Sequence, residues 1–253
     1  MTLLLVDGSN ILMRCAFGGD VAAEKSTPMA AAMIERAARE CHASHLMIAL
    51  DFPGVPTWRH KAFPAYKGHR TRDTSSWLIA GATEFARRRW HVEVSSGFEA
   101  DDIIATIANR SAARAEIVVL SNDSDLLALT AHGVGIARPV TGGTFDLVDE
   151  SGVCVKYGIP IAARLADLKA MTGETGDNVP GVPGIGPTRA AKLITRLGSL
   201  EDIIMAGEGG YSKDSAAVYE HRDIARLSLT LATLRIDVPI DPIAPRQCAW
   251  RAS

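Results

Sequence analysis

The chain has 253 residues, of which 47% are hydrophobic and 22% charged, so it can bury one large core and a smaller one. Its formal net charge of −2 is unusual for a nucleic-acid-binding protein. The first apolar run stops at Asp7 and follows no basic segment, which argues against a signal peptide or a membrane span. The isolated cysteines argue against zinc and against disulfides. We therefore expect a cytoplasmic protein.

Three short apolar runs predict buried strands. They cover residues 3–6, 46–50 and 117–120, and stretches with helical periodicity separate them. Continuous apolar runs of this length are typical of parallel strands that are covered on both faces. The sequence therefore predicts an α/β fold built on a parallel sheet.

Acidic residues follow each predicted strand. Asp7 and Asp51 come directly after the first two runs, and Asp123 and Asp125 lie just beyond the third. Because the carboxyl ends of parallel strands meet at one edge of a sheet, these acids should converge where such sheets bind ligands. Acids also cap helices and decorate loops in most proteins. Their repeated placement favours a shared site.

The run Glu99-Ala100-Asp101-Asp102 adds further acids and opens a predicted helix, in which Glu99 and Asp102 share a face while Asp101 points aside. Two like charges about 4 Å apart repel by roughly 4 kcal/mol at an effective dielectric near 20, so such a cluster requires protons or cations. Oxygen-only ligands favour Mg²⁺ or Mn²⁺. With these acids neutralised by metal, the rest of the chain would be basic.

A segment rich in cations and aromatic residues follows the second predicted strand, at residues 57–60 and 65–70. Lysine and arginine neutralise phosphate, and an aromatic ring can stack on a base, so this mixture suits phosphate binding. A solvated basic loop is the alternative. Residues 71–98 contain a helical stretch from Trp77 to Trp90, which we interpret as a mobile helical cover with solvated arginines at 87–89.

Glycines and prolines form a tight turn at residues 181–187, and an amphipathic helix begins at Thr188. Unpaired backbone amides and the helix dipole at such a turn favour the binding of a phosphate group. The turn directly follows Gly173-Glu174-Thr175-Gly176-Asp177-Asn178 and resembles a helix-hairpin-helix module, which binds the DNA backbone without reading bases.

Together these motifs resemble the 5′-nuclease family, meaning the 5′→3′ exonuclease domain of bacterial DNA polymerase I, phage 5′-exonucleases and flap endonucleases. The similarity covers nearly the whole chain. It rests on Val6-Asp7-Gly8-Ser9-Asn10, Tyr66-Lys67-Gly68-His69-Arg70, Glu99-Ala100-Asp101-Asp102, Ser121-Asn122-Asp123-Ser124-Asp125 and the region from Gly173 to Gly186.

The resemblance implies a PIN-like parallel sheet flanked by helices, with a smaller all-helical helix–three-turn–helix domain. We expect the nuclease domain at residues 1–158, with a helical arch near 66–90. The helical domain would span residues 159–240, followed by a tail at 241–253. Leucines at 227, 231 and 234 would dock the closing helix on the core.

The resemblance also implies residue roles. The first metal would be held by Asp7, Asp51, Glu99 and Asp101. The second would be held by Asp101, Asp123, Asp125 and Asp177. Asp102 and Glu174 would support both. Lys67 and Arg70 would contact the scissile phosphate as catalytic residues. DNA contacts would come from Tyr66, Gly184, Gly186, Thr188, Arg189 and Lys192, with Tyr66 stacking on a base. The carbonyls of Val182 and Ile185 would hold a K⁺ ion.

The implied activity is hydrolysis of DNA near 5′ ends, with two Mg²⁺ or Mn²⁺ ions and 5′-phosphate products. Expected partners are DNA 5′ ends, flaps or nicks, RNA primers, and a separate DNA polymerase, with the enzyme acting as a free-standing monomer away from membranes. Two alternatives stay open: a DNA-binding protein that has lost catalysis, and a PIN-class ribonuclease. The chain departs from the family at Glu174, where Asp is usual, and in its short stretch between Arg70 and Glu99.

Overall fold

The computed structural model describes residues 1–17, 22–70 and 72–251 and divides into two compact units. Unit 1 contains Met1–Trp58, Arg72–Asp149 and Arg235–Ser253, and unit 2 contains Arg59–Thr71 and Glu150–Leu234. This division differs from the predicted boundaries, because residues 59–71 and 150–158 belong to unit 2 and the segment from Arg235 returns to unit 1.

Unit 1 is built on a six-stranded sheet with the order β3-β2-β1-β4-β5-β6. All neighbouring strands are parallel except β5 and β6. The strands are β1 (Thr2–Asp7), β2 (His45–Leu50), β3 (His91–Val94), β4 (Glu116–Leu120), β5 (Gly135–Pro139) and β6 (Phe145–Val148). The predicted parallel sheet is confirmed. The strand order reverses direction between β1 and β4, which is where ligands bind in open α/β sheets.

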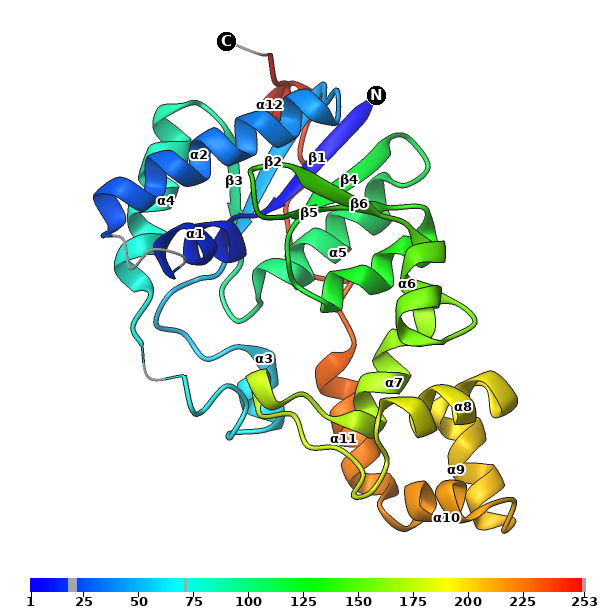
Figure 1. The fold of residues 1–253 in the computed structure, drawn as a ribbon. Helices are drawn as coiled ribbons and strands as arrows, with labels where there is room; N and C mark the ends of the chain where they lie inside the picture. Colours follow the sequence, from blue (N-terminus) through cyan, green and yellow to red (C-terminus); the bar gives the residue numbers. More distant parts are fainter. Residues whose placement is uncertain (18–21, 71, 252–253) are drawn as a thin grey trace. The chain divides into compact units, whose positions relative to one another are not determined.

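Helices cover both faces of this sheet (Figure 1). They are α1 (Gly8–Phe17), α2 (Ala23–Glu40), α4 (Ser75–Arg87), α5 (Ala100–Ser111), the 3₁₀ segment η1 (Asp125–His132) and the short α12 (Pro245–Cys248). One face buries alternate strand residues such as Leu4 and Val6 against α1, α2 and α4. The other face packs on α5, whose Ile103, Ile104 and Ile107 are buried. Burial on both faces explains the continuous apolar runs.

Helix α4 is part of the core, so the expectation of a helical cover is wrong for residues 75–87. Leu78 and Phe85 are buried in the cluster under the sheet. A Cβ atom at Gly81 would lie 2.3 Å from a methyl carbon of Leu12, so the glycine permits α4 to pack closely on α1. Arg87 and Arg88 at the end of the helix form ion pairs with Glu84.

Unit 2 is helical. Its helices are α3 (Trp58–Ala62, counted from Arg59), α6 (Glu150–Tyr157), α7 (Leu165–Thr172), α8 (Pro187–Leu197), α9 (Leu200–Glu208), α10 (Lys213–Glu220) and α11 (Arg222–Ala232), with 3₁₀ turns η2 (Ala162–Arg164) and η3 (Thr175–Asp177). Leu231 of α11 is buried with Tyr66 and Val179, and Leu227 packs on the same cluster. The predicted leucine stripe therefore docks as expected at these two positions.

The last described segment packs on unit 1. The Arg110 guanidinium donates hydrogen bonds to the carbonyls of Val238 and Ile240, at 3.0 Å each. The Trp250 amide donates to the Ser44 carbonyl at 3.0 Å, next to an antiparallel bridge between His45 and Ala249. Among the helices the structure describes, none is long and apolar enough to cross a membrane.

Candidate metal centre and nucleic-acid interface

Asp7 lies at the end of β1, and a hydrogen-bond network fixes its carboxylate. Its two oxygens accept a hydrogen bond from the Asn10 amide at 3.0 Å and one from the Ser121 hydroxyl at 2.7 Å. The same Ser121 oxygen accepts from the Asp123 amide at 2.9 Å, and the Asp123 carboxylate accepts from the Asp125 amide at 2.9 Å. Ser121 therefore couples the acid of β1 to the acids that follow β4.

A second set of contacts joins the end of β2 to the start of α5. The Asp51 amide donates to the Ser9 hydroxyl at 2.8 Å, and the Asp51 carboxylate accepts from the Ala100 amide at 2.8 Å. This carboxylate thus accepts a hydrogen bond from the first residue of α5, the helix that begins after Glu99 and carries Asp101. Ser9 was not among the predicted site residues, and its one signal in the sequence is its position two residues after Asp7.

Asn10 and Ser121 were likewise not among the site residues predicted from the sequence. The Asn10 side chain accepts from the Asn122 amide at 3.1 Å, which ties the turn after β1 to the turn after β4. A Cβ atom at Gly8 would lie 2.6 Å from a methyl carbon of Ile48, so only glycine lets this turn approach β2 so closely.

The electrostatics of this edge favour a bound cation. Burial raises the pKa of the Asp7 carboxyl to about 7, and the nearby carboxylates of Asp123 and Asp51 act in the same direction, against the two hydrogen bonds that Asp7 accepts. Among the described residues, no lysine or arginine forms an ion pair with Asp7 or Asp123. An oxygen-only set of mutually repelling carboxylates fits a hard divalent ion.

The side chains do not form a ready-made cage for such an ion. In residues 1–17, 22–70 and 72–251, no three acidic, histidine or cysteine side chains are grouped closely enough to hold a metal. The donor chemistry and the repulsion between carboxylates fit a divalent ion. The side-chain positions would have to adjust when it binds.

Asp102 is engaged differently from the other acids. It is fully buried, and its carboxylate accepts hydrogen bonds from the Trp58 indole at 2.8 Å, the Arg235 amide at 3.0 Å and the Glu99 amide at 3.3 Å. Both carboxylate oxygens are therefore held by N–H donors. This arrangement suits a residue that positions the start of α5 and so supports the neighbouring acids Glu99 and Asp101.

In unit 2, Asp177 lies between the two predicted catalytic cations. Its carboxylate is 3.6 Å from the Lys67 ammonium and forms an ion pair with Arg70. The Lys67 amide donates to the Asp177 carbonyl at 2.9 Å. Lys67 has φ +52°, an unfavourable conformation for a residue with a side chain, and such strain concentrates at functional sites.

Tyr66 is a core residue, so its predicted role as a base-stacking platform is wrong. Only 3% of its surface is exposed, and its ring packs with Val179 and Leu231. Its hydroxyl donates to the Asp177 carboxylate at 3.1 Å. A buried ring cannot offer a face to a base, so Tyr66 instead supports Asp177.

Glu174 also has a cationic partner. Its carboxylate is 2.9 Å from the ammonium of Lys169, a buried side chain on α7. Aspartate at this position would be one methylene shorter and would not reach equally far. The structure thus supplies a local reason for glutamate here.

The hairpin between α7 and α8 has the features of a backbone-binding turn. Gly184 has φ +78°, which favours glycine. The amides of Gly184, Gly186 and Thr188 donate to no backbone carbonyl within the described part of the chain. Arg189 forms an ion pair with Asp214 at 3.6 Å and donates to the Gly184 carbonyl at 3.0 Å. Arg189 therefore stabilises the hairpin through these contacts, whereas Lys192 is exposed and makes no such contact in the described part of the chain.

Family models match both parts of this chain. The model of the 5′-3′ exonuclease N-terminal resolvase-like domain matches residues 2–158. The model of the 5′-3′ exonuclease C-terminal SAM fold matches residues 161–252. The chain belongs to the 5′-3′ exonuclease family. This is the family that the sequence motifs resembled. The first model ends at residue 158 and the second begins at residue 161, close to the predicted boundary between the two domains.

Named relatives agree with this assignment. A 5′-3′ exonuclease of Streptomyces coelicolor is 33% identical over 79% of this chain and 73% of its own length. A flap endonuclease Xni of Shewanella oneidensis is 27% identical over 94% of this chain and 91% of its own. A DNA polymerase I of Rhizobium leguminosarum is 36% identical over 78% of this chain. The matched part covers only 20% of that polymerase.

Solved structures show the same fold. The T5 5′-exonuclease with bound zinc superposes with a TM-score of 0.78 at 22% identity, covering 92% of this chain and 89% of the T5 chain. At this identity the likeness concerns the fold alone. It confirms the predicted parallel sheet flanked by helices.

Proposed function

We propose that this protein hydrolyses DNA phosphodiesters near 5′ ends, as a 5′→3′ exonuclease and structure-specific flap endonuclease that leaves 5′-phosphates. The observation that carries the proposal is the buried Asp7 carboxylate, held by Ser121 beside the repelling carboxylates of Asp123 and Asp51. These acids lie at or just beyond the ends of β1, β2 and β4, the strands around the reversal in strand order. Membership of the exonuclease family supports the assignment.

The acids of unit 1 are the proposed ligands of two Mg²⁺ or Mn²⁺ ions. Asp7, Asp51, Glu99 and Asp101 would serve the first, and Asp123 and Asp125 the second together with Asp101. Divalent ions supply such sites with an activated water and with stabilisation of the leaving oxygen. The chain itself orients the carboxylates, through Ser121, Asn10 and the amide of Ala100.

Lys67 and Arg70 are proposed to contact the phosphate that is cleaved. The Arg70 guanidinium is half exposed and offers two donors in a plane that matches phosphate oxygens. Lys67 is mostly covered, and its ammonium lies 4.9 Å from the Tyr66 ring centre, so its position is well defined. Cations held in place stabilise the charge that develops on phosphate in the transition state.

Asp177 is also proposed to serve the second metal, with Glu174 as a supporting residue, but the carboxylate of each forms an ion pair with a cationic side chain in this structure. A metal role for Asp177 would require its ion pairs with Lys67 and Arg70 to open. Glu174 would have to leave Lys169. In the hairpin, K⁺ is proposed at the carbonyls of Val182 and Ile185, where the Val182 carbonyl also accepts from the Ile185 amide at 3.1 Å.

The proposed partners are DNA 5′ ends, flaps and nicks, with RNA primers as a further substrate. A separate DNA polymerase would act on the gap that the nuclease leaves. We also propose a monomer that acts in the cytoplasm.

The test is a cleavage assay of the purified protein with Mg²⁺ on end-labelled 5′-flap, nicked, single-stranded and RNA–DNA substrates. The proposal expects cleavage near the 5′ end of the flap, 5′-phosphate products and loss of cleavage in EDTA. Binding of flap DNA without any cleavage in Mg²⁺ or Mn²⁺ would instead identify a DNA-binding protein that has lost catalysis. Cleavage of single-stranded RNA alone would favour a PIN-class ribonuclease.

A further inference from the structure

Arg138 lies near the end of β5, beside the loop that carries Asp123. Leu120 of β4 and Ala137 of β5 are paired in the sheet, and the Ser121 amide donates to the Ala137 carbonyl at 3.2 Å. Arg138 is therefore the next residue along β5, at the point where β4 ends and the acidic loop begins. All of these residues belong to unit 1.

The peptide unit between Asn122 and Asp123 is held at both of its polar ends. Its carbonyl, which belongs to Asn122, accepts a hydrogen bond from the Arg138 guanidinium at 3.2 Å. Its amide, which belongs to Asp123, donates to the Ser121 hydroxyl at 2.9 Å. Because a peptide unit is planar, contacts at its two edges fix its orientation, and with it the direction in which the Asp123 side chain leaves the backbone. Arg138 thus acts from β5 on the same peptide unit as Ser121.

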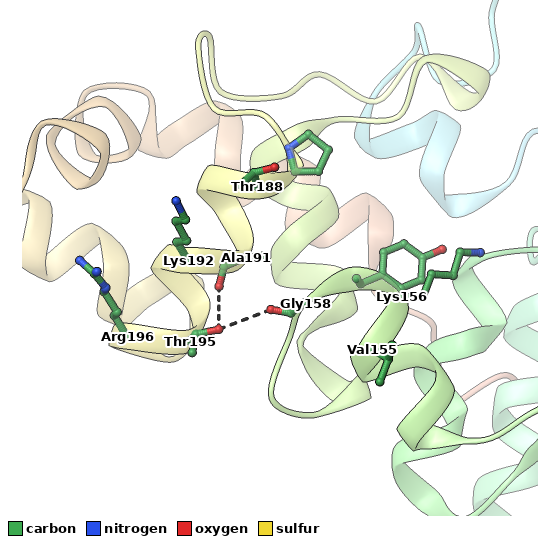
Figure 2. Close-up of a pocket in the computed structure, with 10 residues that line it drawn as sticks. Val155, Lys156, Gly158, Thr188, Ala191, Lys192, Thr195 and Arg196 are labelled. Carbon is green, nitrogen blue, oxygen red and sulfur yellow. Dashed lines mark hydrogen bonds between the residues drawn. The ribbon is translucent and has the colours of Figure 1, made fainter.

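The fold gains little stability from Arg138. The side chain is partly buried, and it forms no ion pair within residues 1–17, 22–70 and 72–251. Its Nε atom is buried and has no hydrogen-bond partner in these ranges. Lys192 and Arg196 of α8 also lack an ion pair there, but they are exposed and extend into solvent (Figure 2). Moving a charged group partly out of water costs free energy when no partner compensates, so a role other than stability is needed to account for Arg138.

We infer that Arg138 is a positioning residue for Asp123 and raises the affinity of the acidic edge for divalent metal. The inference rests on the proposed function, because it takes Asp123 as a metal ligand. One oxygen of the Asp123 carboxylate accepts from the Asp125 amide at 2.9 Å, and the other accepts no hydrogen bond within the described part of the chain. Groups that orient a metal ligand change metal affinity about ten- to a hundredfold.

The charge of Arg138 and its hydrogen bond predict opposite effects on metal binding. A cation near the acids repels a metal ion, so removal of an arginine that acts through charge alone would strengthen metal binding. Removal of an arginine that orients Asp123 would weaken it. Since no described acid forms an ion pair with Arg138, its hydrogen bond to the Asn122 carbonyl is the closer link to the metal ligands. The direction of the change in affinity therefore separates the two mechanisms.

The experiment titrates Mn²⁺ into the metal-free protein without DNA, by isothermal titration calorimetry. It compares wild type with Arg138→Met, which keeps much of the apolar stem, and with Arg138→Gln, a polar variant that guards against misfolding of the first. Arg114→Met is the matched control, because Arg114 is exposed on the turn before β4, at the opposite end of that strand from the acids, and its loss changes the net charge equally. The Tm of each variant in EDTA monitors the fold.

Both Arg138 variants should raise the Kd for Mn²⁺ about tenfold. Their Tm in EDTA should stay within about 4 °C of wild type, and Arg114→Met should match wild type in both measurements. An unchanged or lower Kd in both Arg138 variants would overturn the inference, as would an equal rise in Arg114→Met. A Tm lowered by more than about 4 °C in both Arg138 variants would also overturn it, because the fold itself would then depend on Arg138.

A double-mutant cycle with Ser121→Ala tests whether the two residues act on one peptide unit. Ser121→Ala removes the contact to the amide of that unit, and Arg138→Met removes the contact to its carbonyl. Either change alone releases the peptide, so the two effects on the Kd should not multiply. If each single change raises the Kd about tenfold, the double variant should raise it about ten- to thirtyfold. A rise of about a hundredfold would show independent effects and would contradict the shared-peptide mechanism.

The flap cleavage assay separates this inference from the proposed function. If wild type cleaves flaps and the Arg138 variants bind Mn²⁺ as wild type does, the function stands and the role of Arg138 is removed. If wild type binds Mn²⁺ more tightly than the Arg138 variants but cleaves no DNA, the nuclease proposal is removed and Arg138 remains a positioning residue. Wild type that binds no Mn²⁺ overturns both.

Discussion

The hydroxyl of Ser121 donates a hydrogen bond of 2.7 Å to the carboxylate of Asp7, across two neighbouring strands of the sheet. The Ser121 hydroxyl oxygen also accepts a hydrogen bond from the Asp123 amide. One small buried side chain thus sets the position of two acids from different parts of the sequence. Groups that orient metal ligands in this way strongly influence metal affinity.

Ser121→Ala should therefore weaken metal binding more than it weakens the fold. We expect the Mg²⁺ midpoint for flap cleavage to rise about tenfold, with activity recovered at high Mg²⁺. The free energy of unfolding should fall by about 1 kcal/mol. Ser111→Ala, at the far end of α5, is the control and should change neither. An unchanged Mg²⁺ midpoint would show that Ser121 does not position the ligands.

Asp7→Asn should stabilise the metal-free protein at high pH. The pKa of Asp7 is raised from 3.8 to about 7 in the folded state, so the fold binds this proton more tightly than the unfolded chain does. Stability must therefore fall as pH rises from about 4 to about 7. Asparagine keeps the shape without the charge. Its Tm in EDTA should exceed wild type by about 2 °C or more at pH 8, and the difference should disappear as the pH falls to about 4. A lower Tm than wild type at pH 8 would contradict this account.

Tyr66→Ala should cost about 3–5 kcal/mol of unfolding free energy, because it removes a buried ring from the cluster with Val179 and Leu231. Tyr66→Phe keeps the ring and loses the hydrogen bond to Asp177, at a cost of about 1 kcal/mol. Urea denaturation measures both. A stable Tyr66→Ala protein with weak affinity for DNA would restore the stacking role.

The Lys169–Glu174 pair should be measurable in a double-mutant cycle. Glu174→Gln and Lys169→Met should each destabilise the fold, and the double variant should recover about 1 kcal/mol of coupling, since Lys169 is buried. In Glu174→Asp, the ratio of Mg²⁺- to Mn²⁺-supported cleavage should stay at the wild-type value. A changed ratio without coupling would place Glu174 in the metal coordination sphere instead.

The sequence predicted the sheet and the acids at its edge because both depend on local patterns. An apolar run followed by aspartate identifies the end of a buried strand, as at Val6-Asp7 and Leu50-Asp51. The edge strands β3 and β6 were not predicted, since His91–Val94 and Phe145–Val148 are short and partly exposed and lack a long apolar run; β5, between β4 and β6, was not predicted either.

The remaining features depend on contacts between distant parts of the chain. Ser121 matters only because Asp7 lies on the neighbouring strand, 114 residues away in sequence. Tyr66 lies in a basic segment, and nothing local shows that Leu231 covers it. In α4 the signal was present, because Leu78, Gly81 and Phe85 form one helical face. The resemblance to the family arch and the run of three arginines at 87–89 favoured a cover instead.

The most direct test of the central claim is single-turnover cleavage of a 5′-flap substrate by Asp123→Asn, with DNA affinity measured in parallel. The account predicts that cleavage with Mg²⁺ falls about 100-fold or more, because the variant loses a metal ligand. Affinity for the flap should equal or exceed wild type, because a charge that repels phosphate is gone. Cleavage at the wild-type rate would contradict the assignment of this acidic edge as the metal centre.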